Sequence, residues 1–149
     1  MLDRVARDRT AELLRHLASG RISNDEFEDA LPLETADSAA LAVQHAAWML
    51  YSDLSEHKLT GKHALSAEAK KAVARSIVFL YSDLPYEWPR HRCEGLVRLV
   101  AGLVSLGWIP RYFDERWKQS GDFNVWPFIR QEDYAAALQC PKLLASAPA

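Results

Sequence analysis

The chain has 149 residues, of which 49% are hydrophobic and 26% are charged. This length is enough to bury a core, and this composition is typical of a globular protein, which excludes a disordered chain. The formal net charge of −2 provides no global positive charge for binding nucleic acid or an anionic membrane. We therefore expect one globular domain over residues 1–149.

The N-terminal residues predict two helices. Apolar residues recur at close to helical spacing over Leu2–Leu17, and Gly20 follows as a stop signal. Charged residues begin at the third position, so the apolar stretch of a secretory signal is not expected. Ser23 and Glu26 have the spacing of a capping box, in which each side chain accepts from the backbone N–H of the other residue. A short helix is expected there, ending before Pro32.

Two longer helices are expected in the middle of the chain. Thr35 is the expected cap of the first, with Asp37 in its first turn, and Ser66 is the expected cap of the second. Each helix carries one apolar stripe at helical spacing. The stripes consist of Val43, Ala47, Leu50 and Leu54 in the first helix and of Val73, Ile77, Leu80 and Leu84 in the second.

Helix signals continue in the C-terminal part. Pro89 suits the first turn of a helix that ends at Gly107. Within it, the apolar run Leu96–Ile109 is too short to span a bilayer and contains Arg98, so we expect a buried helix. Short helices are expected over 111–119 and 131–138, an extended segment over 123–129, and a loose tail over 143–149. The sequence thus predicts an all-α single-domain helical bundle of about five to seven helices.

The pentapeptide LYSDL occurs twice, at Leu50–Leu54 and at Leu80–Leu84. We interpret the two copies as the ends of two equivalent helices that form an internal pseudo-repeat. An aspartate is unfavourable in the last turn of a helix, so Asp53 and Asp83 are interpreted as caps of the elements that follow. The alternative is that a pseudo-twofold arrangement brings both carboxylates together for acid–base or metal chemistry.

The strongest compositional signal is charge segregation. From Ile22 to His57 there is no lysine or arginine, whereas eight acidic residues occur. One interpretation is a solvated face that serves solubility. The other is a docking surface for a basic partner, because complementary charge speeds association and selects against wrong partners. The residues predicted to form this acidic face are Asp25, Glu26, Glu28, Asp29, Glu34 and Asp37; Asp53 and Glu56 complete the stretch.

Aromatic and arginine residues are dense on both sides of the expected helix over 90–106. These residue types dominate binding hot spots, so an exposed patch is one interpretation. The other is that the aromatic rings belong to the core. A single patch also requires later helices to fold back, because that helix would be about 25 Å long. The residues of this candidate patch are Trp88, Arg90, Arg92, Arg111, Tyr112 and Arg116.

Motifs for catalysis, metals and cofactors are missing from the sequence. There is no HExxH, no GxSxG and no glycine-rich phosphate loop, so no metal, cofactor or catalytic residue is predicted. No two histidines have the i, i+4 spacing of a helical zinc site. The two cysteines, Cys93 and Cys140, form no recognisable disulfide framework, so a reduced, cytoplasmic setting is the default.

Three hypotheses for function follow. The first is a protein–protein interaction module, such as an immunity or antitoxin-like protein that masks a basic partner through its acidic face; neither nucleic acid nor membrane is an expected partner. The second is a small-ligand-binding protein or an enzyme, with a cleft between the two repeated helices. The third is a structural homodimer. The residues of the cleft would be Tyr51, Asp53, Tyr81, Asp83, Glu87 and His91.

Overall fold

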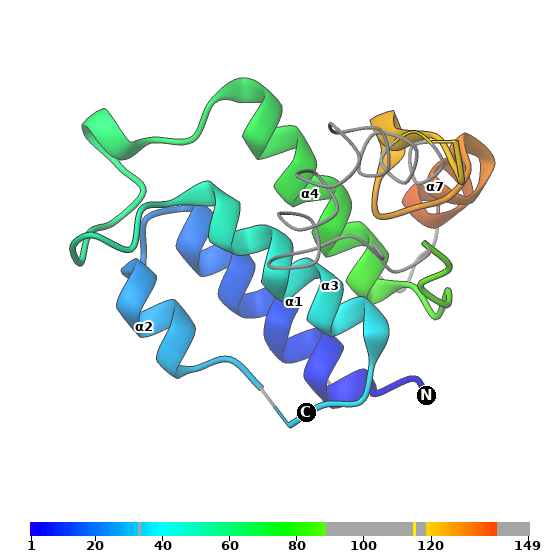
Figure 1. The fold of residues 1–149 in the computed structure, drawn as a ribbon, viewed down its shortest axis with the longest axis horizontal. Coiled ribbons are helices and arrows are strands. Elements are labelled where there is room, and N and C mark those ends of the chain that lie inside the picture. Colours follow the sequence, from blue (N-terminus) through cyan, green and yellow to red (C-terminus); the bar gives the residue numbers. More distant parts are fainter. Residues whose placement is uncertain (33, 89–114, 116–118, 140–149) are drawn as a thin grey trace, which may run out of the picture.

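The computed structural model describes residues 1–32, 34–88, 115 and 119–139. This part of the chain is mostly helical, which confirms the predicted all-α class (Figure 1). Within it there is no strand, and the only β-type pairing is an isolated bridge between Ser23 and Lys58. The α-helices are α1 (Arg4–Ala18), α2 (Asn24–Asp29), α3 (Ser38–Ala47), α4 (Ala67–Tyr81) and α7 (Gln131–Leu138); three short 3₁₀ helices are η1 (Trp48–Leu50), η2 (Gly61–His63) and η3 (Phe123–Val125).

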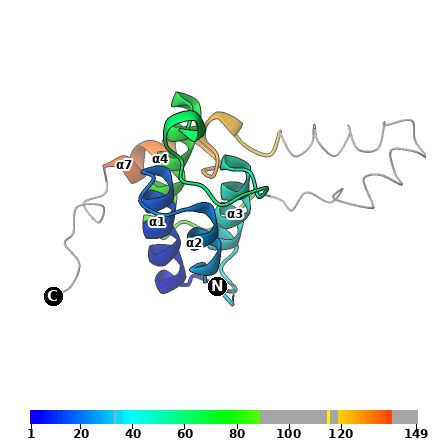
Figure 2. The same cartoon turned by 90° about the vertical axis from the view of Figure 1, so that its left-hand side faces the viewer.

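Helix α1 lies at the centre of the arrangement and contacts α2, α3 and α4. The starts of α1 and α3 lie together, because the backbone N–H of Asp3 donates to the Asp37 carboxylate at 2.8 Å. The end of α4 meets this same end of the molecule, where Arg4 donates to the backbone carbonyl of Ser82 at 3.2 Å. Helices α1 and α3 therefore run in one direction and α4 in the other (Figure 1). Helix α2 lies in front of α1 and α3 when the molecule is turned by 90° (Figure 2).

Two apolar clusters form the core of the described residues. The larger one packs leucines of α1 against Phe27 of α2, Val43 of α3 and Leu80 of α4. The smaller one lies between α4 and the C-terminal segment and includes Phe79 and Phe128. Burial of such side chains is the main stabilising contribution to a fold of this size, and it accounts for the apolar stripes seen in the sequence.

The helix starts follow local capping chemistry. The Ser23–Glu26 capping box is confirmed, and Ser66 caps α4 as expected. The predicted cap at Thr35 was wrong, because Asp37 caps α3 by accepting from the backbone N–H of Ala39 at 2.8 Å. The Thr35 hydroxyl donates instead to the carboxylate of Asp3, the cap of α1.

The two LYSDL copies end their helices, and no helix begins in the described residues that directly follow them, 51–60 and 82–88. Helix α3 continues as η1 to Leu50, and α4 ends at Tyr81. The prediction that Asp53 caps a following helix was wrong, since no helix begins before η2. Leu54 does not extend the apolar stripe either, because its side chain is 95% exposed. Because α3 and α4 run in opposite directions, the two copies lie at opposite ends of the molecule (Figure 1).

The segment expected to be extended, 123–129, forms η3 followed by a turn. The Asp122 side chain caps η3 by accepting from the backbone N–H of Asn124, and the Trp126–Pro127 peptide bond is cis. The loop closes where the Asp122 N–H donates to the carbonyl of Ile129 at 2.9 Å. The predicted helix over Gln131–Leu138 is confirmed as α7. The helices expected over 89–107 and 111–119, and the tail 143–149, lie wholly or mostly outside the described residues.

In the described part of the chain, no helix is both long enough and apolar enough to cross a membrane. Its longest helices, α1 and α4, have 15 residues each. A membrane-spanning helix needs about 20 predominantly apolar residues.

Candidate functional site

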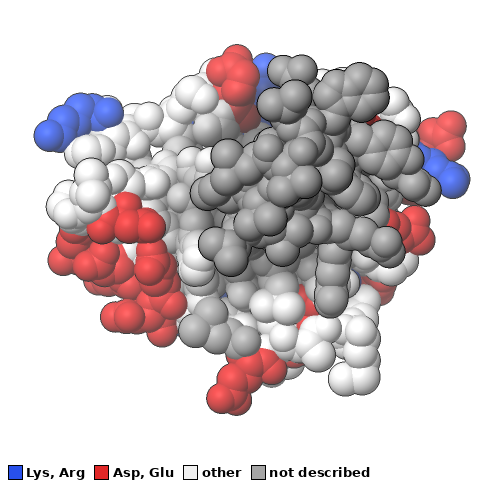
Figure 3. All heavy atoms as spheres, in the orientation of Figure 1, with Lys and Arg blue, Asp and Glu red and all other residues white. Residues whose placement is uncertain are grey.

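Acidic side chains from two segments gather on one surface of the molecule. Four lie on α2, two of them in its first turn, and two lie in the loop that follows η1. Figure 3 shows acidic side chains grouped over α2, at the left of that view. We call this the acidic surface and define it as Asp25, Glu26, Glu28, Asp29, Asp53 and Glu56.

Hydrogen bonds hold the loop after η1 against the start of α2. The Ser23 hydroxyl donates to the Glu56 carboxylate at 2.7 Å, while the Ser23 N–H donates to Glu26 in the capping box. The buried Asn24 side chain donates to the Ser55 carbonyl at 3.3 Å and accepts from the His57 N–H at 2.7 Å. The Glu56 carboxylate is therefore held next to the acidic side chains of the helix, and the backbone of the loop is fixed there.

Tyr51 lies near carboxylates from both segments. Its ring packs edge-on against Phe27 of α2, with the ring centroids 6.3 Å apart. Burial raises the pKa of Tyr51, and the nearby carboxylates of Glu28, Asp53 and Asp25 raise it further. The carboxylates of α2 and of the loop thus act on one phenol, so they form a single field of negative charge.

Basic side chains do not neutralise this surface within the described ranges. The ion pairs among the described residues all lie elsewhere: they join Arg4 to Asp8 and Asp83, Arg7 to Asp37, and Arg9 to Glu12. The nearest basic residue along the loop, Lys58, donates to the backbone carbonyl of Arg21 instead of to a carboxylate. The acidic surface therefore keeps its negative charge and is suited to a positively charged group on another molecule.

Two of the residues predicted to form the acidic face do not belong to the acidic surface. Asp37 is only 1% exposed and forms a buried ion pair with Arg7, so it is not available at the surface. Glu34 is exposed, but it follows α2 and belongs to the connection to α3. The remaining predicted residues, Asp25, Glu26, Glu28 and Asp29, share α2.

Two large exposed apolar side chains, one in η1 and one in the loop of the acidic surface, were not predicted as site residues. Met49 of η1 is 88% exposed and Leu54 is 95% exposed. Leu54 lies in the loop between Tyr51, which packs on α2, and Ser55, which accepts a hydrogen bond from α2. The apolar spacing at Leu54 predicted a position on the buried stripe of the helix. Leu54 lies outside that stripe because α3 ends at Ala47 and the helical turn that follows it ends at Leu50. Leu54 therefore adds one exposed apolar side chain next to Asp53 of the acidic surface.

Of the predicted aromatic–arginine patch, the structure describes only Trp88, and this residue is not exposed as predicted. Trp88 is buried, and its indole N–H donates to the carbonyl of Phe128 at 3.1 Å. It therefore anchors the C-terminal segment and does not form an exposed hot spot. Its proposed neighbours, Arg90, Arg92, Arg111, Tyr112 and Arg116, lie outside the described residues.

The predicted carboxylate cleft is not assembled. Tyr51 and Asp53 lie beside α2, whereas Asp83 lies at the other end of the molecule and pairs with Arg4 at 3.2 Å. Tyr81 is the last residue of α4 and packs against the core at that end. Of the other two predicted cleft residues, Glu87 lines a separate cavity near α7, and His91 lies outside the described residues.

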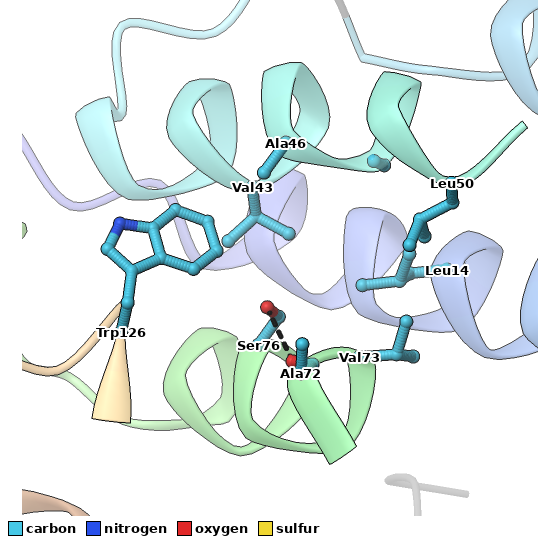
Figure 4. A pocket seen from close by; sticks show the side chains of 9 residues that line it. Leu14, Val43, Ala46, Leu50, Ala72, Val73, Ser76 and Trp126 are labelled. Atoms are coloured by element: carbon cyan, nitrogen blue, oxygen red, sulfur yellow. Dashed lines mark hydrogen bonds between the residues drawn. The ribbon is translucent and has the colours of Figure 1, made fainter. Parts of the chain in front are cut away.

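The space between α3 and α4, where the cleft was predicted, is apolar. A cavity of about 50 Å³ lies there, with Leu14 of α1 behind it and Trp126 at one end (Figure 4). The one hydroxyl in its lining, on Ser76, donates to the backbone carbonyl of Ala72 at 3.0 Å. The side chains that line this cavity therefore offer no charged group for catalysis. The lining consists of Leu14, Val43, Ala46, Ala47, Leu50, Ala72, Val73, Ser76 and Trp126.

Metal-binding groups are sparse in the described part of the chain. No group of three or more histidine, cysteine or carboxylate side chains is placed there to hold a metal ion. The rings of His57 and His63 do lie together, with centroids 4.3 Å apart. Desolvation lowers the pKa of His63, and the neighbouring His57 and Lys62 lower it further. Two side chains fall short of the four ligands of a structural zinc site.

Comparisons with protein-family models, with curated proteins and with solved structures give no match to this chain. We therefore infer its function from its own residues. Among these, the acidic surface has the most distinct chemistry, because negative charge from two segments is fixed in place and not neutralised by the basic residues described.

Proposed function

We propose that this protein is a protein–protein interaction module that binds a basic partner protein through the acidic surface. An immunity or antitoxin-like protein that masks a basic, nuclease-like partner is the specific form of this proposal. The observation that carries it is the convergence of carboxylates from α2 and from the following loop, with no ion pair to a described lysine or arginine.

Electrostatics explains what such a surface contributes to binding. Opposite charges on two proteins raise the rate of association by steering their encounter, and they disfavour partners of the same sign. Charge alone adds little affinity, because exposed ion pairs contribute about 0–1 kcal/mol each. The exposed side chain of Leu54, next to Asp53, supplies apolar area that a partner would bury.

The composition of the surface also bears on the homodimer hypothesis. In a twofold dimer the same patch lies on both subunits, so an interface built on the acidic surface would place carboxylates opposite carboxylates. Like charges opposed in this way are unfavourable. A different protein with a basic surface is therefore the better occupant.

The proposal is tested by capture from the lysate of the cells that produce this protein. The full chain is immobilised, and bound proteins are released with steps of NaCl from about 50 mM to about 500 mM, because salt screens surface charge. We expect one basic protein in stoichiometric amount that leaves as the salt concentration rises. Absence of any stoichiometric protein, or a partner that resists all salt steps, contradicts the proposal.

A further inference from the structure

A second concave site lies away from the acidic surface, between the end of α4 and the start of α7. It is a cavity of about 230 Å³. Drug-sized ligands occupy pockets of roughly 300–1,000 Å³, so this cavity suits a smaller molecule. The residues that line it are Phe79, Leu84, Pro85, Glu87, Phe128, Ile129, Arg130 and Asp133.

The floor of this cavity is apolar and held in place. Phe79 and Phe128 are each 1% exposed, and their rings meet edge to face with centroids 5.0 Å apart. The backbone of Phe128 is fixed by the hydrogen bond from Trp88, and its ring packs against Tyr134 with centroids 5.2 Å apart. These two rings form a buried base, and the apolar groups that a ligand can reach are those of Leu84, Pro85 and Ile129, which are half-buried or exposed.

The rim of the cavity carries charges of both signs that do not pair with each other. Glu87 and Asp133 provide carboxylates, and Arg130 provides a guanidinium group. In the described part of the chain none of the three forms an ion pair, although they line one small cavity. Their side chains also make no hydrogen bond there. Each group thus remains able to bind an opposite charge on a ligand.

We propose that this cavity binds a free α-amino acid with an apolar side chain. The ligand's ammonium group would lie against Glu87 and Asp133, its carboxylate against Arg130, and its side chain against Leu84, Pro85 and Ile129. A zwitterion joins the two unpaired signs of charge through one molecule, which a simple amine or a simple acid does not do. This inference is independent of the proposed docking function, because it uses none of the residues of the acidic surface.

The first test uses L-leucine as the probe and NMR of the uniformly ¹⁵N-labelled full chain as the readout. Because the ligand is small and the rim is open to water, we expect a dissociation constant on the order of 0.1–1 mM. The amide signals of Leu84, Ile129, Arg130 and Asp133 should shift and saturate. N-acetyl-leucine and leucinamide should each bind at least about tenfold more weakly, because each lacks one of the two charges.

Variants test the same site from the protein side. Arg130→Gln and Asp133→Asn should each weaken leucine binding at least about fivefold, because a charge-assisted hydrogen bond is lost. Glu132→Gln, at the adjacent position of α7 but not in the cavity lining, should leave binding unchanged. No shift of these signals at about 10 mM leucine overturns the inference. So does equal binding of either leucine analogue, or unchanged binding by both cavity variants.

Discussion

At the scale of single residues, Arg7 joins the ends of three helices. Its guanidinium group donates to both carboxylate oxygens of Asp37, at 2.7 and 3.1 Å. It also donates to the backbone carbonyls of Ser82 and Leu84, at 3.0 and 2.9 Å, beyond the end of α4. Arg7 is 2% exposed, so burial of the ion pair removes both charges from water. The pair is favourable only because hydrogen bonds to the guanidinium and carboxylate groups offset this desolvation cost. These contacts tie α1 to the start of α3 and to the end of α4.

Replacing Arg7 should therefore be costly. Arg7→Met leaves the Asp37 carboxylate buried without its partner, and we expect the free energy of unfolding to fall by about 3–5 kcal/mol. Arg9→Met removes an exposed ion pair with Glu12 and should cost less than about 1 kcal/mol. Urea denaturation of the two variants measures both values. Equal costs for the two substitutions would show that the buried pair has no special role.

The pH dependence of stability should follow Asp37. Burial alone would raise the pKa of this carboxyl group, but hydrogen bonds from Arg7 and from the backbone N–H groups of Asp3 and Ala39 outweigh it. The pKa is therefore lowered below its ordinary value of 3.8. Because the folded pKa is lower than the unfolded one, the stabilisation is present above the unfolded value and is lost as the pH falls through the folded one.

We expect the free energy of unfolding of the wild type to decline between about pH 5 and pH 2. Asp37→Asn should be less stable at neutral pH and should show a shallower decline over the same range. Urea denaturation at a series of pH values measures both slopes. The same slope in the variant and the wild type would contradict this assignment of the acid sensitivity.

At the scale of elements, the sequence predicts those features that depend on neighbouring residues. The cap at Ser23, the cap at Ser66 and the whole of α7 are local, and all three were predicted correctly. The errors at Thr35 and Leu54 have a different cause. Thr35 is bound by Asp3, which lies far from it in the sequence, and Leu54 lies beyond the last helical turn at Leu50, in a loop that hydrogen bonds hold against α2. Such tertiary interactions override local patterns.

The two serine caps make a matched pair for a stability test. Ser66→Ala removes a cap hydrogen bond at an exposed site and should cost about 0.5–1 kcal/mol. Ser23→Ala removes the cap and also the hydrogen bond to Glu56, so we expect about 1–3 kcal/mol. Denaturation curves give the two costs, and amide exchange at His57 reports on the loop. A larger loss for Ser66→Ala would contradict the role of Ser23 in holding the loop against α2.

At the scale of the whole molecule, one long stretch of the chain carries acidic residues without basic ones. The stretch from Ile22 to His57 lacks lysine and arginine, and this pattern alone indicates an acidic region. The sequence does not show which of these acids are buried, because Asp37 and Asp25 differ only in their tertiary contacts. It also does not show that Asp53 joins the charges of α2, which depends on the loop that packs there.

Two positions of the acidic surface can be reversed in charge without removing a described hydrogen bond or ion pair. Asp25 and Asp29 are exposed on α2, so Asp25→Lys combined with Asp29→Lys should leave the fold intact. The matched control is Glu68→Lys combined with Glu132→Lys, which makes the same change in net charge in the first turns of α4 and α7.

The most direct measurement of the central claim is the rate constant of association between the captured partner and these two double variants. Surface plasmon resonance at about 100 mM salt suits this comparison, because surface charge is only partly screened there. If the acidic surface steers the partner, the association rate constant of the α2 double variant should be about tenfold lower than that of the wild type, or lower still. The rate constant of the control double variant should change by less than about threefold. Equal association rates for the two double variants would contradict docking through the acidic surface.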